Sequence, residues 1–490
     1  MIKTRRIQND NHFLKMALIR QLLFVSIILC ISLPVEAQKG YKVSFHIKGL
    51  SDTVCLIANY YGNGTYVKDT LKVDKSGRCI FRAGDDLPKG IYIFIINDKN
   101  YFDFIINNDK EFSMEADRSN TLQTMKSKGS PENRLFYEYL VYNKSKYDIV
   151  EKYQDRLNKL SKGSDSVKTV ADTIERINEL LINYKLAIVK NHPESFLAFM
   201  INVMKEPEIP KNLTLTNGHV DSAAAYRYYR NHFWDDVSFT DDRALRTPVF
   251  HSKLLKYFDK VLPQSSPDTI IYEADFLIEK SRMNPEMFKY MVWFVTRQYE
   301  NSDIMGFDKI FVHVVNKYYV TGQTPWVNET VKKEIIKKAA RMEPLLIGKR
   351  PPNMIMQDTS LNLVSMYNVN AKILLILFWD PECGHCEQEI PKLVDFYNTV
   401  KSNYGLEVYA VCSDSTLSRM KSYIRKKKMD WINVDGPRTL TPEYHSLYDI
   451  TQTPVIYILN EQKEIIAKRL TVEQIEKFLE NYLKKKDRQH

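Results

Sequence analysis

Cysteine is scarce in this sequence, which has 6 in 490 residues. A count this low excludes the disulfide-dense scaffolds of small secreted domains. Glycine and proline are also sparse, at 16 and 19 residues, which excludes collagen-like and low-complexity chains. Because 44% of the residues are hydrophobic and 27% are charged, the composition is that of a folded protein. At roughly 150 residues per domain, the length predicts about three domains.

A dense basic segment is lacking as well. The formal net charge is +10, but the lysines and arginines are spread thinly over the chain. Nucleic-acid-binding proteins usually gather these residues on one face or one helix. The run Arg425–Lys428 is short and is typical of the solvated end of a helix. We therefore expect no nucleic-acid partner.

The N-terminus has the layout of a secretory signal. The apolar run Leu22–Leu33 follows Arg20 and precedes Pro34–Ala37, which offers small residues for cleavage. The run is too short for a comfortable membrane span, which needs about 20 apolar residues. We expect residues 1–37 to be removed and the mature chain, without a membrane span, to be exported, to the periplasm if the source is Gram-negative. An uncleaved signal anchor is the alternative.

Residues 38–118 are predicted to form a β-sandwich. Tyr41–Lys48 alternates apolar and polar residues, and turn signals follow at Gly62–Gly64 and Asp74–Gly77. Short strands at regular spacing between such turns are typical of a sandwich. Cys55 and Cys79 fall on two of these strands. Both a structural disulfide and two independent buried thiols remain open.

Residues 119–345 are predicted to form an all-α domain. Ser130-Pro131, Asn284-Pro285 and Thr324-Pro325 each place a capping residue before a proline suited to the first helical position. The sequence shows no cluster of His, Cys, Asp and Glu with metal-ligand spacing, and we expect no metal or cofactor. Apolar residues recur at helical spacing in 133–160, 165–190, 250–262, 284–299 and 326–341.

Residues 346–490 are predicted to form an α/β domain after a hinge at Gly348–Pro352. Ile373–Phe378 is an uninterrupted apolar run, as expected of a strand buried on both faces. Leu406–Val411 and Val455–Leu459 are the next candidate strands, with helical patterns between and after them. This alternation indicates a sheet covered by helices.

The motif that could carry out a reaction is Cys383-Gly384-His385-Cys386, directly after the buried strand and at the start of a predicted helix. Backbone N–H groups and the helix dipole would stabilise a thiolate at Cys383. Cys386 lies about one turn further on, where it could resolve a mixed disulfide. His385 could tune the redox potential. A zinc site would need a second ligand pair, which is absent, and a static disulfide across so short a loop would stabilise little.

With these features, residues 345–486 resemble the thioredoxin-fold domains of the TlpA/ResA branch, the envelope thiol–disulfide oxidoreductases. Pro391 matches the proline of the active-site helix, and Thr453-Pro454 matches the cis-proline loop. The resemblance implies that Cys383 and Cys386 form a redox-active disulfide. It also implies that Trp379, Thr453 and Pro454 bind the substrate.

The resemblance has one informative departure. The buried aspartate that thioredoxins carry six residues before the first cysteine is Leu377 here. Glu389, three residues after Cys386, matches a glutamate that ResA-like proteins use near the thiol pair. The resemblance therefore implies that Glu389 assists proton transfer.

We expect an exported oxidoreductase that exchanges disulfides with cysteine-containing envelope proteins and with a redox partner protein. The N-terminal modules would choose or hold the partner, or support a homodimer. The alternative is an envelope binding or adaptor protein whose thioredoxin-like domain is a docking module. A peroxiredoxin fits less well, because Asp380 and Ile376 stand where that family has Thr/Ser and Pro.

Overall fold

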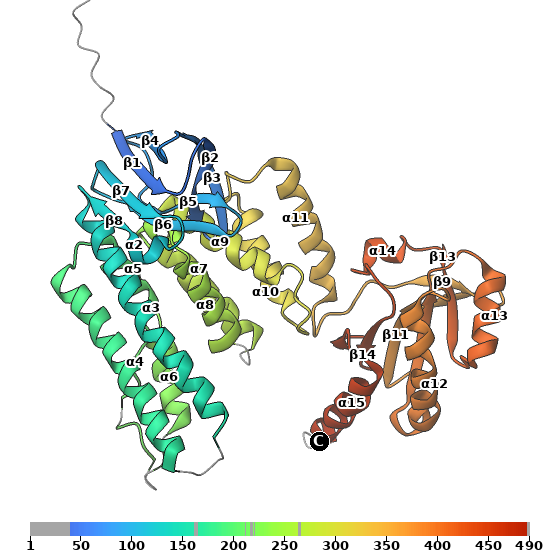
Figure 1. Ribbon diagram of the computed structural model, residues 1–490. Helices are drawn as coiled ribbons and strands as arrows, with labels where there is room; N and C mark the ends of the chain where they lie inside the picture. Colours follow the sequence, from blue (N-terminus) through green and yellow to red (C-terminus); the bar gives the residue numbers. More distant parts are fainter. Residues whose placement is uncertain are drawn as a thin grey trace, which may run out of the picture. The chain divides into compact units, whose positions relative to one another are not determined.

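The computed structural model describes residues 40–160, 165–210, 212–215, 219, 221–262 and 266–487 (Figure 1). The predicted signal, residues 1–37, lies outside them. Two compact units can be distinguished. The first holds the described residues up to Val237 together with Arg243–Lys256, and the second holds Ser238–Asp242 with the described residues from Tyr257 onward. The predicted domain boundaries at 118/119 and 345/346 stay predictions.

The first unit begins with a β-rich region, as predicted. Its described strands form two four-stranded sheets, β4-β1-β7-β8 and β3-β2-β5-β6, which contribute to one hydrophobic core. Their packing as a sandwich stays a prediction. Cys55 and Cys79 are both buried and both free thiols. The strands are β1 (Gly40–Lys48), β2 (Thr53–Tyr61), β3 (Gly64–Val73), β4 (Arg78–Gly84), β5 (Gly90–Asn97), β6 (Asn100–Ile106), β7 (Glu111–Asp117) and β8 (Lys126–Lys128).

Helices complete the first unit, and α3 and α4 run side by side in Figure 1. The side chain of Ser130 caps α3 ahead of Pro131, as predicted. The buried amide of Asn133 ties this helix to β6, because it bonds both the N–H (2.7 Å) and the carbonyl (2.8 Å) of Ile105. The helices are α2 (Thr121–Thr124), α3 (Pro131–Asn158), α4 (Asp165–Asn191), α5 (Phe196–Met204), α6 (Ser222–His232), η1 (Asp242–Arg246, whose first residue belongs to the second unit) and α7 (Val249–Lys256).

The second unit opens with further helices. Asn284 caps α9 ahead of Pro285, as predicted. The prediction that Thr324-Pro325 begins the helix expected over residues 326–341 is wrong. That helix starts at Glu329, because the side chain of Asn328 accepts the N–H of Thr330 and caps it there. The elements are η2 (Tyr257–Val261), α8 (Pro267–Ser281), α9 (Pro285–Tyr299), α10 (Asp308–Val314), η3 (Val315–Tyr319), α11 (Glu329–Met342) and η4 (Glu343–Leu345).

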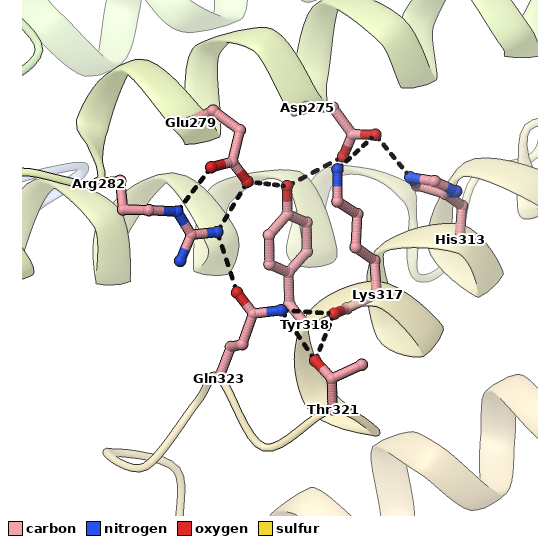
Figure 2. A network of polar contacts seen from close by, with 8 residues as sticks. All are labelled: Asp275, Glu279, Arg282, His313, Lys317, Tyr318, Thr321 and Gln323. Atoms are coloured by element: carbon pink, nitrogen blue, oxygen red, sulfur yellow. Dashed lines mark hydrogen bonds and ion pairs between the residues drawn. The ribbon is translucent and has the colours of Figure 1, made fainter.

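A polar network joins α8 to α10 and η3 (Figure 2). Asp275 on α8 contacts His313 at 2.8 Å and Lys317 at 3.0 Å, and it accepts a hydrogen bond from Tyr318 at 3.0 Å. Burial alone would raise the pKa of Asp275, but its hydrogen bonds with His313 and Lys317 lower it below the ordinary value. The charged carboxylate therefore holds these helices together.

The remainder of the second unit is the predicted α/β domain. Its sheet has the order β10-β9-β13-β12-β11-β14-β15, and β11 is fully buried between two hydrophobic clusters. β11 runs parallel to β12 and antiparallel to β14. The elements are β9 (Ile355–Asp358), β10 (Leu363–Ser365), η5 (Met366–Asn368), β11 (Ile373–Trp379), α12 (Gly384–Tyr404), β12 (Leu406–Cys412), α13 (Leu417–Lys427), β13 (Ile432–Thr439), α14 (Tyr444–Leu447), β14 (Val455–Leu459), β15 (Ile465–Lys468) and α15 (Val472–Asp487).

Candidate active site

The cysteine motif lies where the buried strand β11 passes into α12. Cys383 occupies the N-cap position of this helix, and its carbonyl accepts the N–H of Glu387 at 3.1 Å. The N–H of Cys383 donates to the carbonyl of Asp380 at 3.2 Å, which closes a tight turn. The first turn of a helix has backbone N–H groups without intrahelical acceptors, so negative charge is stabilised here.

The thiol of Cys383 is partly exposed and lies 3.1 Å from the carbonyl oxygen of Thr453. Burial acts to raise the pKa of Cys383, but hydrogen bonds lower it below the ordinary value. These bonds involve the side chain of Thr453 and the backbone N–H groups of Cys386 and His385. Cys383 therefore has the environment of a reactive thiolate.

Cys386 is in the opposite situation. It lies on the inner face of α12 and is fully buried. Burial raises the pKa of Cys386 to about 12. Both cysteines are free thiols. The accessible, acidic thiol and the buried, protonated thiol are thus suited to different steps of one exchange reaction.

The Thr453-Pro454 peptide bond is cis, as predicted, and leads directly into β14. It faces the helix start through the contact between Thr453 and Cys383. Trp379, predicted to bind substrate, is fully buried instead. Its ring packs against Tyr423 at a centroid distance of 5.0 Å. It therefore supports the cysteine loop from within the core and offers no exposed surface.

His385 and Glu389 both line a cavity beside the cysteine pair. His385 is exposed at the helix start. The carboxylate of Glu389 binds the ammonium of Lys392 at 2.7 Å, and Lys392 also binds Glu473 at 2.7 Å. The predicted proton transfer through Glu389 stays a prediction.

Asp380 is a site residue that the sequence reasoning missed. One carboxylate oxygen accepts the N–H of Glu382 at 2.8 Å, and the other accepts the hydroxyl of Ser413 at the end of β12. The N–H of Ser413 in turn donates to the carbonyl of Trp379 at 2.9 Å. These bonds anchor the cysteine loop to the sheet. The sequence Asp380-Pro381-Glu382 is a turn signal that could have pointed to the first of them.

Within the described residues, no cluster of His, Cys, Asp and Glu side chains could hold a metal ion. The same part of the chain contains no helix long and apolar enough to cross a membrane.

Family models match three stretches of the chain. A family described as thioredoxin-like matches residues 370–465. Two families described as domains of unknown function match residues 41–136 (DUF4369) and 154–343 (DUF5106). The stretch with a known fold is therefore the one that carries the cysteine pair.

Curated relatives and solved structures are also similar. Thiol-disulfide oxidoreductase ResA of Bacillus cereus (strain ZK / E33L) is 24% identical over 147 residues, 30% of this chain and 82% of the relative. A domain of a possible thiol-disulfide isomerase from Cytophaga hutchinsonii is 40% identical, covering 29% of this chain and 97% of that one, with a TM-score of 0.28. A thioredoxin-like protein from Bacteroides caccae is 21% identical, covering 56% and 97%, with a TM-score of 0.46.

Proposed function

We propose, from the match of residues 370–465 to a family described as thioredoxin-like, that the protein is an exported thiol–disulfide oxidoreductase acting on protein cysteines. The observation that carries the proposal is the Cys383 thiol at the helix start, 3.1 Å from the carbonyl of Thr453. The name of the ResA relatives supports the same reaction class. Envelope proteins with cysteines are the proposed substrates, and a second redox protein resets the pair.

In the reducing direction, the Cys383 thiolate attacks one sulfur of a substrate disulfide. A mixed disulfide forms, and the other substrate sulfur leaves as a thiolate. Cys386 then loses its proton and attacks the sulfur of Cys383, which releases the second substrate thiolate. The substrate gains two electrons, and the Cys383–Cys386 pair becomes a disulfide. The oxidising direction is the reverse.

Each remaining residue has a proposed role in this reaction. Because its pKa is raised to about 12, Cys386 needs a proton acceptor, for which we propose Glu389. His385 contributes its backbone N–H to the thiolate of Cys383. Thr453-Pro454 holds the substrate main chain opposite the cysteines.

The lowered pKa of Cys383 favours catalysis over the alternative of a docking module, in which an ordinary thiol would suffice.

The test is reduction of insulin by the full chain, with dithiothreitol as the electron source. Cys383→Ser should abolish the acceleration. Cys386→Ser should leave a protein that forms mixed disulfides but does not turn over. Cys412→Ser is the matched control, because this thiol is buried in the same domain and outside the pair. Unchanged activity of Cys383→Ser would contradict the proposal.

A further inference from the structure

A cavity of about 760 Å³ lies beside the cysteine pair. One side consists of His385, Glu389 and the cis-proline loop with Gln452 and Pro454. The other side is not part of the thioredoxin-like domain: it consists of the end of α9, the following residues up to Asp303, and side chains of α11. Volumes of this size are typical of ligand-binding sites. The cavity is too small for a folded domain and has room for a short extended segment.

The helical side of this cavity is held in place by ion pairs. Asp308, the first residue of α10, pairs with Lys468 on β15, and both side chains are almost fully buried. Lys468 also donates to the carbonyl of Leu345 at 2.6 Å. Nearer the cavity, Asp449 pairs with Arg341 of α11 at 3.3 Å and with Arg469 at 3.2 Å. The helices therefore form a fixed wall beside the cis-proline loop.

The wall has polar groups but little net charge to offer. Lys338 of α11 donates to the side chain of Asn301 at 2.7 Å and lies 3.5 Å from a carboxylate oxygen of Glu300. Arg341 is paired with Asp449. Because the cations are matched by carboxylates, the cavity favours a ligand that is recognised through main-chain polar groups. An extended polypeptide has such groups along its whole length.

We propose that residues 299–303, with Lys338 and Arg341, form the second wall of the substrate groove and contact the main chain on either side of the substrate cysteine. The substrate is then a cysteine in an extended, unfolded segment of a partner polypeptide. The proposal rests on the proposed function, because it assumes that Cys383 reacts with a polypeptide thiol or disulfide. It assigns a specificity role to a part of the chain outside the thioredoxin-like domain.

The first experiment traps the bound segment in the full chain. Cys386→Ser is mixed with an unstructured peptide whose single cysteine is joined by a disulfide to a chromogenic aryl thiol. The Cys383 thiolate attacks the peptide sulfur, the aryl thiolate leaves, and its absorbance measures capture. A photoreactive benzoylphenylalanine beside the peptide cysteine is then activated, and the crosslinked residues are mapped by mass spectrometry.

Crosslinks to residues 299–303 or to α11 are the expected result. Crosslinks confined to the thioredoxin-like domain, with capture intact, would overturn the wall and leave the proposed function standing. Failure to release the aryl thiolate would overturn the proposed function itself, and the wall with it.

A second experiment blocks the groove from the helical side. Asn301→Trp places a large ring at the wall, and Val331→Trp is the matched control, since Val331 is exposed on α11 and outside the cavity. Asn301→Trp should slow reaction with the unfolded peptide disulfide about tenfold, which corresponds to about 1.4 kcal/mol. Its reaction with a small aryl disulfide and its reduction potential should be unchanged. If Asn301→Trp slows the reaction with both disulfides equally, or slows neither reaction, the proposed wall is contradicted.

Discussion

The thiol of Cys383 donates to the carbonyl oxygen of Thr453 at 3.1 Å, a contact between residues 70 positions apart. This contact brings the start of α12 and the loop before β14 into one site. Burial acts to raise the pKa of both cysteines; it prevails at the buried Cys386, whereas at Cys383 hydrogen bonds outweigh it and lower the pKa. The chemistry of the site depends on this difference, which leads to the first prediction.

The rate at which iodoacetamide alkylates Cys383 should reach half its maximum at a pH below the pKa of a free cysteine, which is about 8.5. Only the thiolate reacts, and the pKa of Cys383 is lowered, so the thiolate is present at lower pH. Cys386, with a pKa of about 12, should stay unmodified at neutral pH. Mass spectrometry of the reduced protein measures both. Thr453→Val should move the half-maximal pH of Cys383 upward, whereas Thr451→Val should leave it unchanged.

A second prediction concerns Asp380, whose carboxylate binds the N–H of Glu382 and the hydroxyl of Ser413. Asp380→Ala should lower the free energy of unfolding by about 1–3 kcal/mol, because it leaves these donors without acceptors. It should also change the reduction potential, since the loop carries Cys383. Asp380→Asn keeps an acceptor oxygen, so its free energy of unfolding and its reduction potential should both lie close to those of the wild type. If the asparagine variant is as damaged as the alanine variant, the charge and not the hydrogen bonds would be the cause.

The redox site was more accessible to sequence reasoning than its surroundings. The spacing of Cys383 and Cys386 after a buried strand predicted their place at a helix start, and the resemblance to thioredoxin-fold domains implied the cis bond before Pro454. The structure has both features at the predicted places. Trp379 was predicted to bind substrate, but it is buried against Tyr423. The sequence did not reveal this burial, since aromatic character alone does not indicate whether a side chain is exposed.

Contacts between residues far apart in the chain could not be predicted from the sequence, for a physical reason. Ser413 binds Asp380 from 33 positions away, and Lys338 reaches Asn301 from 37 positions away. Neither pair has a local periodicity or spacing that would reveal it. A helix start is hard to predict where the sequence offers two capping residues close together. At α11 both Thr324 and Asn328 were available, and Asn328 is the residue that caps the helix.

A third prediction tests the junction between strand and helix in the first unit. Asn133 is fully buried and bonds both backbone groups of Ile105. Asn133→Ala should lower the free energy of unfolding by about 2–4 kcal/mol, because buried polar groups lose their partners. Urea denaturation followed by circular dichroism measures it. Asn63→Ala, at an exposed turn of the same unit, should change stability by about 0.5 kcal/mol or less. A similar effect of both changes would contradict the role of Asn133.

The fourth prediction concerns Asp308 and Lys468, which pair across 160 positions with both side chains nearly buried. Burial lowers the pKa of Lys468 although Asp308 acts against this effect, so the ammonium depends on its partner. Asp308→Ala alone should cost about 3–5 kcal/mol of unfolding free energy, because a buried charge is left unpaired. Asp308→Leu combined with Lys468→Met should recover most of that loss, since apolar side chains can replace a buried ion pair. Denaturant unfolding of the wild type, Asp308→Leu, Lys468→Met and the double variant gives the double-mutant cycle. Additive losses would show that the two groups do not stabilise one another.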